Sequence, residues 1–161
     1  PQLKYLLYWA AASPPFALQL LSREYNSHPF VVQYAVRVLR SFPPDTIVFY
    51  LPQLVQVLRY DKLGFVEEYL LQAVKQSQIL AHQLIWTCLS YSKDPEKCIV
   101  PLAPITNRLR QKIVKRFDKV SRHNYQQEFD FFEKVTNISG ILLQHAPEDR
   151  RKILREELVK M

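Results

Sequence analysis

Apolar residues recur at the spacing of an α-helix along most of this 161-residue chain. Within 32–39, 47–58 and 66–73 they recur three or four residues apart, which places them on one side of a helix. Runs of alternating polarity, which would indicate strands, are hard to find. The pattern therefore predicts an all-α protein.

Glycine is unusually rare, because Gly64 and Gly140 are the only two in the chain. β-Hairpin turns and loops that approach a phosphate closely usually need glycine. The scarcity therefore argues against a hairpin-rich fold and against a glycine-rich nucleotide-binding loop.

The prolines predict where helices begin, since proline is tolerated in a first helical turn. The start signals are Ser13-Pro14, His28-Pro29, Pro43-Pro44-Asp45 and Asp94-Pro95-Glu96. Gly64 suits a left-handed stop for the helix that contains Pro52, and Pro52 either kinks that helix or restarts it.

These boundaries give about seven to nine helices with short connections, which favour antiparallel neighbours. The predicted architecture is a set of stacked antiparallel helical hairpins, an α-solenoid of the HEAT or armadillo kind, although no clean sequence repeat is visible.

Positive charge is concentrated in 107–122, which holds seven Arg or Lys and one Asp, a net +6 of the chain's +7. A continuous helix over 105–122 is expected to carry two opposite faces. Its cationic face would hold Arg108, Lys112, Lys115, Arg116, Lys119 and Arg122. Its apolar face, directed to the core, would hold Leu109, Ile113, Val114, Phe117 and Val120.

The cationic face suits an acidic membrane surface or an acidic protein partner, and a solvated outer face is the structural alternative. RNA is the weaker alternative, because the segment has no helix-turn-helix or RNA-binding signature.

No residue pattern indicates catalysis. His82 and Cys88 lie near each other in sequence, but two ligands without a third make a poor metal site. A packed histidine, hydrogen-bonded beside Trp86, is the better interpretation. Cys88 and Cys98 are predicted to be reduced thiols. We expect no catalytic, cofactor-binding or metal-binding residue in this chain.

No apolar run reaches the roughly 18 residues of a membrane-spanning helix. The first residue is Pro1, with no initiator methionine, so we expect a piece of a longer protein.

Two sequence stretches resemble the helical accessory domain of phosphoinositide kinases. They are "YLPQLVQVLRYD", with Pro52, Leu54, Leu58, Arg59, Tyr60 and Asp61, and "SQILAHQLIW", with His82 and Trp86. Within that family the chain is most similar to the type III alpha phosphatidylinositol 4-kinases, specifically across 38–92 and 127–140. The similarity across 127–140 rests on the stretch "EFDFFEKVTNISG" at 128–140.

The resemblance implies a helical accessory (PIK) domain over 1–143 and a segment over 144–161 that leads toward a kinase domain. Leu54, Val55 and Leu58 would be core residues, and the domain would be a non-catalytic scaffold. The parent enzyme would use ATP and Mg to phosphorylate the 4-hydroxyl of phosphatidylinositol at the cytoplasmic face of a membrane.

The implied partners are the kinase domain of the same chain, protein scaffolds and an acidic membrane surface, with no nucleic acid. Two alternatives stay open at this point: a HEAT-like adaptor without a kinase, and a basic helical module that binds RNA.

Overall fold

The computed structural model describes residues 2–91 and 101–159. The chain divides into two compact units, Pro1–Lys115 and Arg116–Met161, which are described separately. All regular structure in the described residues is helical, which confirms the predicted all-α class. Cys98 and the predicted helix start at Asp94-Pro95-Glu96 lie outside the described residues.

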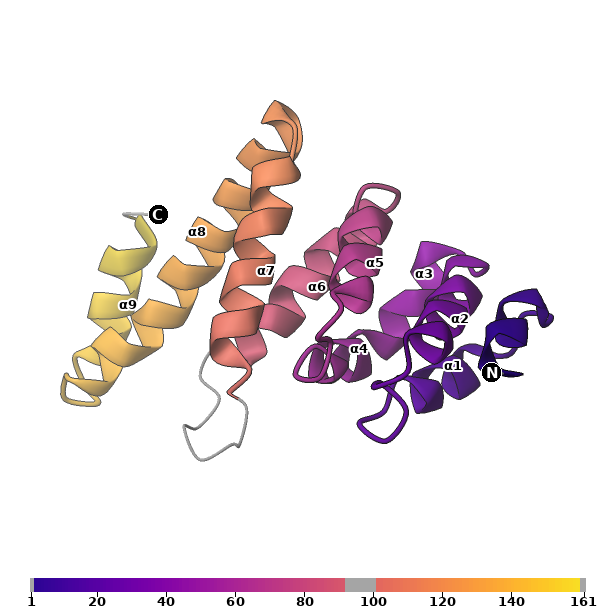
Figure 1. Cartoon of the computed structure of the whole chain (residues 1–161). Coiled ribbons are helices and arrows are strands. Elements are labelled where there is room, and N and C mark those ends of the chain that lie inside the picture. Colours follow the sequence, from indigo (N-terminus) through magenta and orange to yellow (C-terminus); the bar gives the residue numbers. More distant parts are fainter. Residues whose placement is uncertain (1, 92–100, 160–161) are drawn as a thin grey trace. The chain divides into compact units, whose positions relative to one another are not determined.

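Figure 1 shows the helices in chain order. The first unit contains the 3₁₀ helices η1 (Gln2–Tyr8) and η2 (Val48–Tyr50). Its α-helices are α1 (Pro14–Leu20), α2 (Pro29–Arg40), α3 (Pro44–Ile47), α4 (Leu51–Val57), α5 (Phe65–Ala73), α6 (Gln78–Ser90) and most of α7 (Ala103–Arg116). The second unit contains α8 (Lys119–Leu143) and α9 (Arg150–Val159).

The core of the first unit is formed by the apolar faces that the sequence predicts. The faces of α2 and α5 are buried, with Val32 and Leu39 on one and Val66 and Leu70 on the other. α2 packs against η1, α1 and α5, whereas α6 packs against α3, η2 and α4. The antiparallel-hairpin and solenoid arrangement stays a prediction.

Side chains of α2 hold the N-terminal 3₁₀ helix in place. The Tyr34 hydroxyl donates to Ala10 O at 2.8 Å, and the Trp9 ring meets the Tyr34 ring edge-on, with 6.4 Å between centroids. The Arg37 guanidinium donates to the carbonyl oxygens of Leu7 and Trp9. Residues 2–12 therefore belong to the same packed unit.

Proline begins several of these helices. The predicted starts at Pro14, Pro29 and Pro44 each fall in the first turn of a helix. Pro52 also lies in the first turn of α4, so it restarts the helix rather than kinking it. A proline there loses no helical hydrogen bond, because the first N–H groups have no partner inside the helix.

The expectation that Gly64 stops the helix containing Pro52 is wrong. α4 ends at Val57, and turns lead from there to Gly64. Gly64 has the predicted left-handed backbone, with φ of 73°, but it serves as the N-cap of α5. Glycine adopts a left-handed backbone without steric cost at either junction, so the conformation was predictable from glycine and the role was not.

The second unit buries little apolar surface. Ile138 is its only buried residue within 116–159, although α8 and α9 contact each other. Phe131 is 61% exposed, Val135 43% and Leu143 74%. The predicted domain boundary at 143 stays a prediction.

Candidate interaction surface

α7 is anchored to the first unit by one face. Leu109 and Ile113 are buried, as the predicted apolar face requires, and Thr106 is buried beside them. The Thr106 hydroxyl donates to the carbonyl oxygen of Leu102, the residue before α7, at 3.2 Å, so the buried polar group is satisfied. The opposite side of α7 carries Arg108, Lys112 and Lys115.

An acidic residue of α5 engages two of these cations. Lys112 Nζ donates to Glu67 Oε1 at 2.8 Å, and Arg108 Nε lies 3.8 Å from the same oxygen. The Glu67 side chain is 18% exposed, whereas those of Arg108 and Lys112 are 62% and 43% exposed. The pairs therefore tie α7 to α5 and neutralise part of the positive charge.

Glu67 was not predicted from the sequence as an interacting residue. It lies 45 residues from Lys112, and a contact across that distance depends on how the helices pack. The only available signal was an acidic residue in the first turn of a predicted helix, which is common because it complements the helix dipole.

The expected continuous helix over 105–122 is wrong. α7 ends at Arg116, and α8 begins at Lys119 with Asp118 as its N-cap. The Asp118 carboxylate accepts from the Ser121 N–H at 2.7 Å, and this backbone bond, with one from the Ser121 side chain, lowers the pKa of Asp118. Aspartate competes for backbone N–H groups in this way, so it favours a cap over a helix interior.

The six predicted cations therefore do not share one helical face. Arg108, Lys112 and Lys115 belong to the first unit, and Arg116, Lys119 and Arg122 to the second. Within the second unit, Arg122 Nη2 donates to Phe117 O at 3.3 Å.

The predicted apolar face of that helix also divides at the break. Phe117 is half-buried against Tyr125, with 6.0 Å between ring centroids, and Tyr125 in turn meets Phe129 at 4.4 Å. Val120 is 67% exposed, so it does not face a core as expected.

The motif residues of 52–61 divide between packing and surface. Leu54, Val55 and Leu58 are buried, as predicted, and Pro52 is exposed. The Asp61 carboxylate reaches the start of α5, where its Oδ2 accepts from the Glu67 N–H at 2.8 Å.

The protonation of Asp61 is set by two opposing effects. Burial raises the pKa of this carboxyl, and its hydrogen bonds from the N–H groups of Glu67, Val66 and Phe65 work in the opposite direction. The Asp61 Oδ1 atom is buried and has no hydrogen-bond partner among the described residues. Asp61 thus caps the start of α5, and burial makes its charged form less favourable.

The predicted pairing of His82 with Trp86 is confirmed. Trp86 Nε1 donates to His82 Nε2 at 2.9 Å along α6, and both side chains are half-buried. Nearby Cys88 is buried, which raises the pKa of its thiol to about 12. A thiol with that pKa stays protonated near neutrality and is a poor nucleophile or metal ligand.

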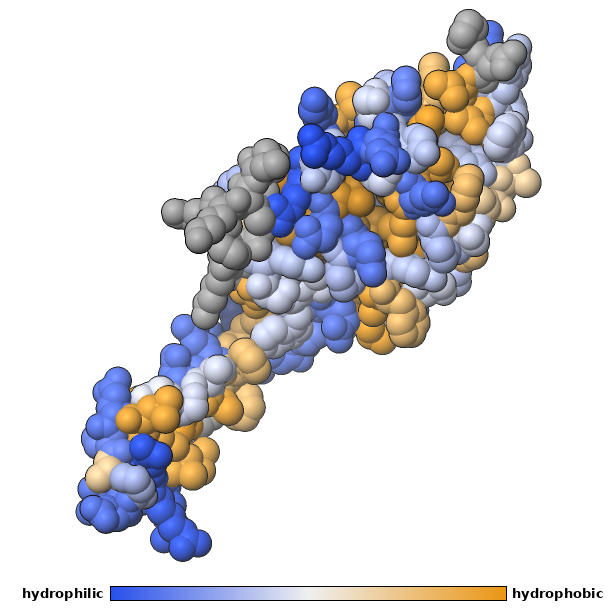
Figure 2. Space-filling model, turned by 90° about the horizontal axis from the view of Figure 1, so that it is seen from below, coloured by the Kyte–Doolittle hydropathy of each residue, from blue (hydrophilic) through white to orange (hydrophobic). Residues whose placement is uncertain are grey.

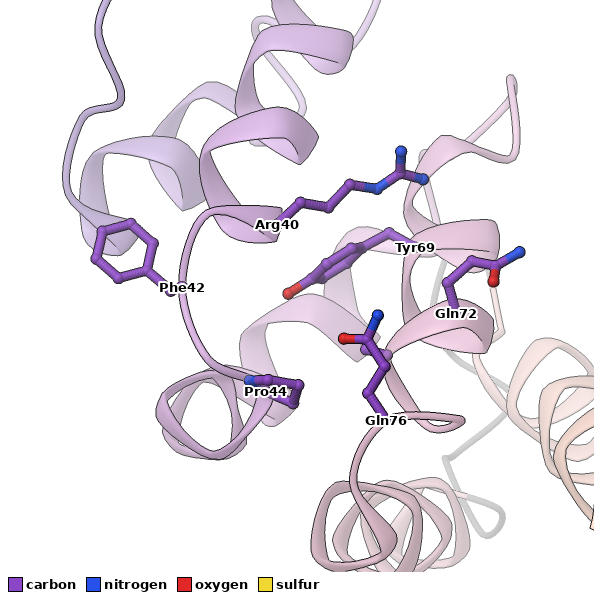
Figure 3. Close-up of a pocket in the computed structure, with 7 residues that line it drawn as sticks. Arg40, Phe42, Pro44, Tyr69, Gln72 and Gln76 are labelled. Carbon is purple, nitrogen blue, oxygen red and sulfur yellow. The ribbon is translucent and has the colours of Figure 1, made fainter.

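One cavity in the first unit, of about 390 Å³, lies between α2 and α5. Figure 3 shows Arg40, Tyr69, Gln72 and Gln76 around it. The Tyr69 hydroxyl donates to Leu39 O at 3.4 Å, and burial raises its pKa to about 12. Among the described residues, the cavity lining thus offers neutral hydrogen-bonding groups and one cation, Arg40.

Across residues 2–91 and 101–159, none of the helices combines the length and the apolar character needed to cross a bilayer.

Comparison with known proteins identifies similar chains. Residues 1–126 match the model of the phosphoinositide 3-kinase family accessory domain, the PIK domain. The chain is 42% identical to phosphatidylinositol 4-kinase alpha 1 of Arabidopsis thaliana, over 99% of this chain and 8% of that protein.

Two fungal proteins are similar over the same span. Phosphatidylinositol 4-kinase STT4 of Saccharomyces cerevisiae is 35% identical over 96% of this chain, and stt4 of Schizosaccharomyces pombe is 33% identical over 98%. The chain spans 8% and 9% of their respective lengths.

Proposed function

Because the chain belongs to the PIK accessory-domain family, we propose that it is the non-catalytic helical domain of a phosphatidylinositol 4-kinase and supports the kinase domain. One observation carries the proposal: three phosphatidylinositol 4-kinases match 96–99% of this chain, which is under a tenth of their own length. This similarity favours the kinase over a HEAT-like adaptor or an RNA-binding module.

The parent enzyme transfers the γ-phosphate of ATP to the 4-hydroxyl of phosphatidylinositol. Phosphoryl transfer of this kind uses Mg²⁺ held by acidic groups and a lysine near the phosphates, and we assign these groups to the kinase domain of the parent enzyme, outside these 161 residues. The purified chain is therefore expected to leave phosphatidylinositol vesicles unlabelled when supplied with ATP and Mg²⁺. Labelled lipid from a contaminant-free preparation would contradict this assignment.

The contact with the kinase domain is assigned to the apolar side of α8. Phe131 and Val135 lie one turn apart and are 61% and 43% exposed. Exposed apolar side chains at this spacing suit a second packed surface. We assign that surface to the kinase domain of the same chain.

The full-length kinase with Phe131→Ser and Val135→Ser tests the scaffold role. We expect lower phosphorylation of phosphatidylinositol and faster proteolysis between the two domains. The control is Phe49→Ser, which changes a side chain that is 80% exposed in the first unit. Wild-type activity and proteolysis in the α8 variant would contradict the proposed contact.

The remaining partners are protein scaffolds and an acidic membrane surface, which place the parent enzyme peripherally at the cytoplasmic face of a membrane. Cations of each unit support a membrane contact on their own, with Lys115 in the first unit and Lys119 in the second, since each one near an anionic surface contributes about 1 kcal/mol. Reversing Lys115 and Lys119 to Glu in the full-length kinase should weaken sedimentation with acidic liposomes roughly thirtyfold or more at low salt.

Lys112 is left unchanged in this variant, because a carboxylate there would face Glu67 and destabilise the packing of α7. Lys4→Glu with Lys75→Glu is the control of equal charge. Equal sedimentation of both variants with acidic liposomes would exclude a specific role for Lys115 and Lys119.

A further inference from the structure

Two turns of the first unit meet around a second cavity, of about 520 Å³. One turn follows α1 and the other follows α4, and Figure 1 shows both on the lower side of this unit. The lining residues are Arg23, Asn26, Ser27, Pro29, Arg59, Tyr60, Lys62 and Leu63. We call this space the cationic cavity.

Among the described residues, the lining of the cationic cavity carries three positive charges, from Arg23, Arg59 and Lys62, and no carboxylate. Asp61 belongs to the same turn, but its Oδ2 accepts from the Glu67 N–H and its side chain does not line the cavity. Figure 2, seen from below, shows strongly hydrophilic residues gathered over this part of the first unit. The charged side chains among the described lining residues are thus all cationic.

Neighbouring groups orient the cations. The guanidinium carbon of Arg23 lies 5.9 Å from the centroid of the Tyr60 ring, and Arg59 Nε donates to Gln56 Oε1 at 3.1 Å. Asn26 is 7% exposed, and its Nδ2 donates to Leu21 O at 3.2 Å, which stabilises the turn that follows α1. Groups ordered before binding lose less conformational entropy when a ligand arrives.

We propose that the cationic cavity binds a small phosphate-bearing ligand, either a free phosphorylated molecule or a lipid headgroup. Its volume lies within the range of about 300–1,000 Å³ typical of small-molecule sites. Guanidinium groups match the oxygens of a phosphate with paired hydrogen bonds, and a lysine adds a compact charge. Pro29 and Leu63 supply apolar wall for the body of the ligand. The cavity in Figure 3, by contrast, has one cation in its lining.

The test measures binding of inorganic pyrophosphate to the 161-residue chain by calorimetry at low ionic strength. The cavity variant carries Arg23→Gln, Arg59→Gln and Lys62→Gln. The control variant carries Arg151→Gln, Lys152→Gln and Arg155→Gln on α9, where all three side chains are exposed. Both variants lose two arginines and one lysine, so their net charges are equal.

We expect saturable binding of one pyrophosphate to the wild type and the control variant, and a loss of about tenfold or more in the cavity variant. Lys62→Gln alone, at an exposed side chain, should weaken binding while leaving the melting temperature unchanged. Absence of saturable binding to the wild type, or equal affinity of the cavity and control variants, would overturn the proposal.

A second arm identifies the source of the phosphate. Vesicles of phosphatidylcholine with phosphatidylinositol 4-phosphate are compared with phosphatidylcholine vesicles in which phosphatidylserine supplies the same total negative charge. Preferential sedimentation with the first, lost in the cavity variant, supports a headgroup. Pyrophosphate binding without that preference supports a free ligand, and vesicle binding that survives in the cavity variant contradicts the headgroup.

Discussion

The Asp61 carboxylate has two roles that substitutions can separate. It caps α5, and it carries a negative charge that burial makes less favourable. Asp61→Ala removes the acceptor for the Glu67 N–H and leaves the first turn of α5 without this cap. Loss of such a cap costs about 0.5–2 kcal/mol. For a chain of this size, each kcal/mol lowers the melting temperature by roughly 2–4 °C.

Asp61→Asn keeps an oxygen acceptor for the Glu67 N–H and removes the charge. Its amide nitrogen takes the place of Oδ1, which already lacks a protein partner in the described part of the chain. We therefore expect a smaller loss of stability than for Asp61→Ala. Asp130→Ala, an exposed carboxylate on α8, is the control and should change the unfolding free energy by less than about 0.5 kcal/mol.

The two acceptors differ most clearly in their response to pH. Burial raises the pKa of Asp61 above its ordinary value of 3.8, so the folded state binds the proton more tightly than the unfolded state. Stability from this group is then fully present below pH 3.8 and is lost as the pH rises through the raised folded value. The wild type should therefore gain stability relative to Asp61→Asn as the solution is acidified through that window.

Urea unfolding of both proteins at several pH values measures this difference, and the other carboxylates cancel because both proteins share them. The opposite result, a wild type that loses stability relative to Asp61→Asn on acidification, would mean that the N–H groups of Phe65, Val66 and Glu67 outweigh burial. A pH-independent difference would refute a shifted pKa altogether.

Two further predictions concern the packing of the first unit. Leu54→Ala should destabilise the fold by about 2–5 kcal/mol, because Leu54 is fully buried. The control Leu63→Ala, at a half-exposed site, should cost less than about 0.5 kcal/mol. Similar urea midpoints for the two variants would contradict the assignment of Leu54 to the core. Trp86→Phe should lower the free energy of unfolding by about 0.5–1.5 kcal/mol, because it removes the N–H that donates to His82. A double-mutant cycle with His82→Ala should show a coupling energy between the two residues, and a chelator should leave that energy unchanged. Zero coupling would mean that the bond contributes no stability.

Local chemistry made much of the first unit predictable. The burial of Val32, Leu39 and Leu54 follows from a period of 3.6 residues, and the starts at Pro14 and Pro29 follow from the missing N–H of proline. These signals act within a few residues, so they do not depend on how the helices pack.

The helix boundaries in the cationic segment, residues 107–122, were harder to predict, because two features of its sequence conflict. Its apolar period continues through Phe117 and Val120, which favours one helix, whereas Asp118 favours a cap. The cap prevails, since Asp118 accepts from the Ser121 N–H. Glu67 was not predictable, because its pairing with Lys112 depends on tertiary packing.

The stretch "RYDK" after α4 shows why a turn can serve both packing and binding. If the helix continued past Val57, Arg59, Tyr60, Asp61 and Lys62 would point in directions about 100° apart, and no three of them would meet at one place. Because α4 ends at Val57, the turn sends the Asp61 carboxylate to the start of α5 while Arg59 and Lys62 line the cationic cavity. The carboxylate that caps α5 is thereby directed toward that helix, and its side chain does not line the cavity. The capping and the positive potential of the cavity are therefore linked: Asp61→Ala, which frees this turn, should weaken pyrophosphate binding even though it removes a negative charge. Tighter binding in that variant would mean that Asp61 acts on the cavity only through its charge.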